Sequence, residues 1–137
     1  MKLSLTASAL ALAVLAAACS GNDGEIKLDA VQTPLTDKGA DTLFTLEIVK
    51  ARDGGYASDG LKVKVTPDGK EAIEVSCVVT DVNGNKTLDV GDKLACVEPA
   101  ENKLGADIAG KEVKVELFAT IDGSEERVGD ATWTPAK

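Results

Sequence analysis

The chain has 137 residues, a formal net charge of −8, no histidine, and 3% aromatic residues. The lack of histidine excludes Ser-His-Asp and Cys-His catalytic groups, and also histidine-ligated zinc or haem. Nucleic-acid binding requires a basic face or stacking rings, so this acidic composition predicts no nucleic-acid partner.

The first eighteen residues have the composition of a secretory signal peptide. A positive charge at Lys2 precedes a mostly apolar stretch over residues 3–14, and small residues follow over 15–18. Such an order is typical of a signal that is removed on export, and the apolar stretch is short for a bilayer-spanning helix. We therefore expect residues 1–18 to be a signal peptide.

Cys19 follows the small residues directly, and residues 1–20 resemble the signal of bacterial lipoproteins, with Ala16 where leucine is most usual. The resemblance implies that Cys19 becomes the first mature residue and carries the lipid. Ser20, in place of aspartate, implies the outer membrane of a Gram-negative cell envelope. The alternative is an ordinary signal peptide with an incidental cysteine.

Residues 19–25 are predicted to be a flexible tether that starts at the lipidated cysteine. Small polar residues over 20–25 favour flexibility, and six residues reach about 20 Å at most when extended. The expected partners are therefore the membrane, through the lipid anchor, and an unidentified protein of the same envelope.

Period-two alternation of apolar and polar residues dominates the chain from Ile26 onward and predicts strands with one apolar face each. Asp-Gly turn signals separate the strands. The alternation changes parity between Val128 and Ala131, which predicts a β-bulge. The one candidate helix, residues 100–110, contains two glycines. The predicted strands cover residues 26–32, 42–51, 61–66, 73–79, 94–96, 113–121 and 128–133.

About seven one-faced strands predict a single all-β domain over residues 26–137. One-faced strands must cover one another, so an antiparallel β-sandwich is expected. The order of a long strand, a glycine-rich loop and Leu-Lys-Val-Lys-Val-Thr-Pro over 42–68 resembles bacterial immunoglobulin-like domains. This resemblance covers at best residues 42–134 and implies an immunoglobulin-like β-sandwich.

Residues 81–92 carry oxygen side chains with the spacing of an EF-hand loop and resemble the dockerin variety, which implies a structural calcium ion. Lys86 stands at the sixth position, where glycine is usual. The alternative is an asparagine-rich hairpin loop without metal. The candidate ligands are Asp81, Asn83, Asn85, Thr87 through its carbonyl, Asp89 and Asp92.

Two cysteines flank this loop symmetrically. Cys77 lies four residues before Asp81, and Cys96 lies four residues after Asp92. If the flanking strands pair as a hairpin, the cysteines stand opposite each other with Cα atoms roughly 4.5–5.5 Å apart, within disulfide range. An exported compartment is oxidising. We therefore predict a Cys77–Cys96 disulfide that closes the loop.

Two aromatic side chains are candidate partner contacts. Tyr56 lies in the most glycine-rich loop, and Phe118 has the parity of its strand's charged residues. The alternatives are that the Tyr56 ring rests on the end of the sandwich and that Phe118 covers a neighbouring strand or loop.

The sequence predicts a non-enzymatic lipoprotein with a structural or adaptor function. No nucleophile–base motif is recognisable in it, so an enzyme is not expected. The alternative is a ligand-binding or inhibitor-type module that uses the loops at one end of the sandwich.

Overall fold

The structure is a computed structural model that describes residues 24–36, 39–82, 84–99 and 104–137. The predicted signal peptide, Cys19 and most of the predicted tether lie outside the described residues, as does Asn83. The described chain forms β1 (Glu25–Ala30), β2 (Thr42–Lys50), β3 (Tyr56–Ala57), β4 (Lys62–Pro67), β5 (Ile73–Thr80), β6 (Thr87–Leu88), β7 (Lys93–Val97), a 3₁₀ turn η1 (Ala106–Ile108), β8 (Val113–Ile121) and β9 (Ser124–Trp133).

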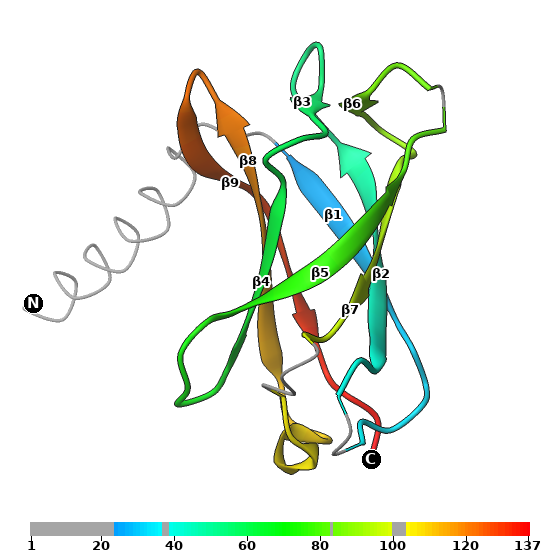
Figure 1. Cartoon of the computed structure of the whole chain (residues 1–137), viewed down its shortest axis with the longest axis vertical. Coiled ribbons are helices and arrows are strands. Elements are labelled where there is room, and N and C mark those ends of the chain that lie inside the picture. Colours follow the sequence, from blue (N-terminus) through cyan, green and yellow to red (C-terminus); the bar gives the residue numbers. More distant parts are fainter. Residues whose placement is uncertain (1–23, 37–38, 83, 100–103) are drawn as a thin grey trace, which may run out of the picture.

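Seven strands form one antiparallel sheet in the order β1-β2-β7-β5-β4-β8-β9. The outer strands β1 and β9 contact each other, so the sheet curls almost into a barrel (Figure 1). The expected all-β antiparallel fold is confirmed. Separate sandwich sheets are not confirmed, because pairing continues through β5: residues 73–75 pair with β4 and residues 76–80 pair with β7.

The local predictions correspond closely to the strands of the structure. The register of β8 and β9 shifts between Leu117 and Phe118, which leaves Val128 as the extra residue of the predicted bulge. Within the described part of residues 100–110, the helical element is the short turn η1. Sequence analysis missed the two-residue strands β3 and β6, which are too short to show any periodicity.

The inward faces of both halves of the sheet meet in one apolar core. The rings of Phe44 from β2 and Trp133 from β9 meet edge to face with centroids 5.2 Å apart. Such contacts between distant strands convert one-faced strands into a stable fold, because each strand buries its apolar side. The other fully buried apolar side chains of the sheet include Leu46, Val65, Val113, Val115 and Leu117.

The two ends of the barrel carry different loops. The upper end carries residues 51–61, residues 84–92 and the β8–β9 turn, whereas the β4–β5 turn, η1 and the C-terminus lie at the lower end (Figure 1). Gly24 is packed at the upper end, because a Cβ there would overlap the Val128 carbonyl oxygen and stand 2.7 Å from the Tyr56 hydroxyl. The described chain therefore begins at this end.

Candidate functional site

A disulfide joins β5 and β7 at the base of the 81–92 loop. Cys77 and Cys96 are opposite residues of the two strands, with Cα atoms 4.0 Å apart and their sulfur atoms bonded. The Cys77–Cys96 disulfide predicted from the symmetric spacing is thus present. The bond closes a loop that contains the predicted calcium motif, and all of the candidate ligands except Asn83 are described residues.

The Asp92 side chain organises this loop from within. It is fully buried, and its two carboxylate oxygens accept hydrogen bonds from the backbone N–H groups of Val82, at 2.8 Å, and Asp89, at 2.7 Å. The Asp92 carbonyl accepts the N–H of Ile48 in β2 at 2.9 Å. A buried carboxylate is stable only when it is well bonded, so these contacts explain how Asp92 is accommodated.

The Asp81 side chain supports the first half of the loop in a similar way. Its carboxylate accepts the backbone N–H groups of Gly84, at 3.0 Å, and Lys86, at 2.6 Å. Lys86 adopts a positive φ of 62°, so the sixth position makes the sharp turn without glycine. The Asn85 side-chain amide donates to the Asp89 carboxylate at 2.8 Å.

The described residues predicted to bind calcium thus bond to one another and to backbone N–H groups of the same loop. Thr87 also belongs to this set, since its N–H donates to the Asn85 side-chain oxygen at 3.0 Å. Among the described residues, no group of three or more Asp, Glu, His or Cys side chains is close enough to hold a metal ion. The donor set therefore fits a self-bonded loop better than a preformed metal centre, and calcium binding stays a prediction.

The loop packs on the β2–β3 segment. Tyr56 pairs with Leu88 in the small β3–β6 sheet, and Ser58 donates to the Lys86 carbonyl at 3.0 Å. Gly55 has a φ of +68°, and a Cβ there would overlap the Asp89 carboxylate. Only glycine allows this close approach, so Gly55 lets the two loops pack together.

Neither of the two aromatic candidates has a fully solvent-exposed ring. Tyr56 is 3% exposed, and its hydroxyl accepts the Arg52 N–H at 3.4 Å, so the ring rests on the barrel end as the alternative expected. Phe118 is half-buried on the outer face, with the Lys64 ammonium 4.7 Å from the ring centroid. Cation–π contact of this kind covers the ring.

A network of ion pairs surrounds Phe118. Lys62 and Lys64 each lie 3.2 Å from the Glu125 carboxylate, and Arg127 lies 3.2 Å from Glu116. Hydrogen bonds from the two lysines hold the pKa of Glu125 below its ordinary value. Solvent-exposed ion pairs contribute little to the free energy of unfolding. The main effect of this network is therefore to balance the charges on the outer face.

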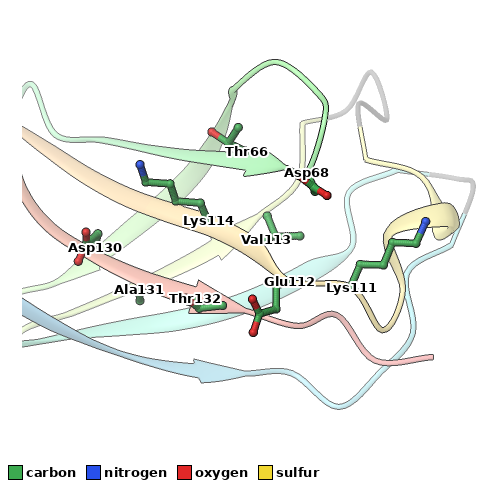
Figure 2. Close-up of a pocket in the computed structure, with 9 residues that line it drawn as sticks. All are labelled: Thr66, Asp68, Lys111, Glu112, Val113, Lys114, Asp130, Ala131 and Thr132. Atoms are coloured by element: carbon green, nitrogen blue, oxygen red, sulfur yellow. The ribbon is translucent and has the colours of Figure 1, made fainter. Parts of the chain in front are cut away.

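An open groove of about 690 Å³ lies at the lower end of the outer face formed by β4, β8 and β9 (Figure 2). Sequence analysis missed it, because it depends on cross-strand register: Thr66 pairs with Lys114, which pairs with Thr132. The groove combines both charges with hydroxyl groups, a lining suited to polar contacts. Its residues are Thr66, Asp68, Lys111, Glu112, Val113, Lys114, Asp130, Ala131 and Thr132.

Comparisons of the chain with protein-family models, curated proteins and solved structures found no match. In the described ranges, no helix has the length and apolarity needed to cross a membrane.

Reduction of the disulfide is expected to lower the free energy of unfolding by about 3 kcal/mol, because the reduced chain gains loop entropy when unfolded. Urea unfolding with and without a thiol-free phosphine reductant measures this difference. The Cys77→Ala/Cys96→Ala double variant is the control and should not respond to the reductant. Equal stability of the oxidised and reduced wild-type chains would contradict the structural role of the bond.

Asp92→Ala is expected to lower the free energy of unfolding by about 2–4 kcal/mol, because two backbone N–H groups lose their acceptor. Urea unfolding in the presence of a chelator measures this loss without any contribution from calcium. Asp53→Ala, an exposed aspartate of the neighbouring loop, should change stability by less than about 0.5 kcal/mol. A similar effect of both substitutions would show that Asp92 does not organise the loop.

Proposed function

We propose that this chain is a small, non-enzymatic cell-envelope lipoprotein with a structural or adaptor role. The observation that carries the proposal is the signal-like segment in which small residues over 15–18 lead directly to Cys19. The Cys77–Cys96 disulfide supports export, because such bonds persist in oxidising compartments. The proposed location is the outer membrane, reached through the lipid on Cys19.

The position of Gly24 supports an adaptor role. Gly24 is packed at the upper end of the barrel, and Cys19 precedes it by five residues, which span about 18 Å at most. A lipid at Cys19 would hold the upper end near the membrane and turn the lower end, with its groove, away from it. In this orientation the groove can meet a protein of the envelope.

We also propose that the fold belongs to the immunoglobulin-like class. β5 changes partner after Val75, from β4 to β7, and such a change would allow the strands on its two sides to face each other as two layers. The contact of Phe44 in β2 with Trp133 in β9 is consistent with this packing. This arrangement supports the sandwich pattern expected from residues 42–68.

The groove also favours the second candidate function, a ligand-binding or inhibitor-type module. This candidate was expected to use the loops at one end of the sandwich, but the ring of Tyr56, a candidate contact in those loops, is buried. The groove between Thr66 and Thr132 is open to solvent and carries both charges, so it suits a peptide segment better than an apolar small molecule. Both candidates thus place contact at the lower end.

We expect Cys19 to be lipid-modified in the membrane fraction of cells that make the full chain. Mass spectrometry of the mature N-terminus should find a diacylglycerol and an acyl group, and Cys19→Ala should abolish both. A soluble mature form with an unmodified Cys19 would overturn the lipoprotein proposal.

A photo-cross-linker at Thr132 tests the adaptor role separately from lipidation. The same cross-linker at Thr80, an exposed residue of β5 far from the groove, is the matched control. An envelope-protein adduct at Thr132 but not at Thr80 is expected. Identical adducts at both positions, or none at Thr132, would contradict groove-based contact.

Calcium binding by the 81–92 loop is a further part of the proposal. Extracellular modules bind calcium with dissociation constants of about 10⁻⁴–10⁻³ M, so 5 mM calcium should raise the melting temperature by roughly 4–8 °C relative to chelator. Magnesium at the same concentration controls for ionic strength. Equal melting temperatures in calcium and chelator would remove calcium from the proposed function.

A further inference from the structure

Glu98 is a buried acid at the lower end of the barrel. It directly follows β7 and continues the inward parity of Leu94 and Cys96. Only 2% of the residue is exposed. One side-chain oxygen, Oε1, accepts the Asp41 N–H at 3.3 Å, and the other, Oε2, has no hydrogen-bond partner among the described residues. An ionised carboxylate in this position leaves one buried oxygen without compensation.

Asp41 connects Glu98 to the β1–β2 loop. The Glu98 N–H donates to the Asp41 carbonyl at 3.0 Å. The Asp41 carboxylate in turn accepts the backbone N–H of Thr36 at 2.6 Å and its hydroxyl at 3.0 Å. Thr36, Asp41 and Glu98 therefore form one hydrogen-bonded chain from the loop to the end of β7.

We propose that Glu98 and Asp41 form a proton-dependent latch, which ties Thr36 and Asp41 of the β1–β2 connection to the end of β7 while Glu98 is protonated and weakens when Glu98 ionises. A protonated Glu98 is neutral and can share its proton with the neighbouring Asp41 carboxylate. Loss of that proton to solvent leaves two carboxylates side by side, one of them buried. This inference is independent of the lipid anchor.

The electrostatics of the described residues support this assignment of the proton. Burial, followed by side-chain hydrogen bonding with the Asp41 carboxyl group, raises the pKa of Glu98 to about 7, against the opposite effect of the Asp41 backbone N–H. The backbone hydrogen bond from Thr36 lowers the pKa of Asp41. Asp41 is the one charged residue of the described chain that shifts the pKa of Glu98.

The direction of the pH effect follows from the raised pKa of Glu98. In the unfolded chain Glu98 has its ordinary pKa of 4.5, whereas in the folded state its pKa is about 7. The folded state therefore binds the proton more strongly than the unfolded state does. The stabilisation is complete below pH 4.5 and is lost as the pH rises through 7. From pH 5 to pH 8 the folding equilibrium constant should fall by a factor on the order of 70.

The test is urea unfolding of the full chain between pH 5 and pH 8. Glu98→Gln keeps an acceptor for the Asp41 N–H and cannot ionise, so its stability should not fall over this range. Glu71→Gln, at an exposed carboxylate, is the control and should keep the wild-type slope. A wild-type chain without the slope, or a Glu98→Gln variant that retains it, overturns the latch.

A second measurement does not depend on the variant folding. The side-chain carboxyl ¹³C resonance of Glu98 in the wild-type chain should titrate with a midpoint near pH 7. Amide exchange at Thr36 and Asp41, corrected for the intrinsic pH dependence, should become faster above this midpoint. A midpoint below pH 5, or protection that is unchanged across the midpoint, contradicts the latch.

Discussion

The pairing of β5 with β7, made covalent by the Cys77–Cys96 disulfide, is the constraint on which the rest of the structure depends. The disulfide lies where β5 has just left β4 for β7, so it fixes the strand through which the two halves of the sheet are joined. The fixed pairing of β5 with β7 also fixes the positions of the two ends of the 81–92 loop. With its base held closed, short hydrogen bonds inside the loop can order it at little further entropic cost.

Two buried acids flank β7, and their bonding gives them different chemistry. Asp92, just before the strand, has both oxygens bonded to backbone N–H groups and organises a loop. Glu98, just after the strand, has one oxygen bonded and one that finds no partner in the part of the chain that the structure describes. A fully bonded carboxylate is a structural group, whereas a half-bonded one favours a proton, because desolvation then outweighs the hydrogen bonding available to the charged form.

The two ends of the outer face differ in how their charged side chains are arranged. Near the upper end, the lysines next to Phe118 are neutralised by Glu125, so that part of the outer face is balanced and its ring is covered. Near the lower end, Lys111 and Glu112 border a groove that remains open to solvent (Figure 2).

The sequence by itself determined the features that depend on local spacing. Alternation and Asp-Gly turns indicated the main strands and the bulge at Val128, and symmetric spacing indicated the Cys77–Cys96 pair. Tertiary structure decided the curl of the sheet, the burial of Tyr56 through β3 and β6, the self-bonding of the 81–92 loop, the groove and the environment of Glu98. These features arise from contacts between residues far apart in the chain, and a pattern that repeats every two residues contains no information about which distant strands meet.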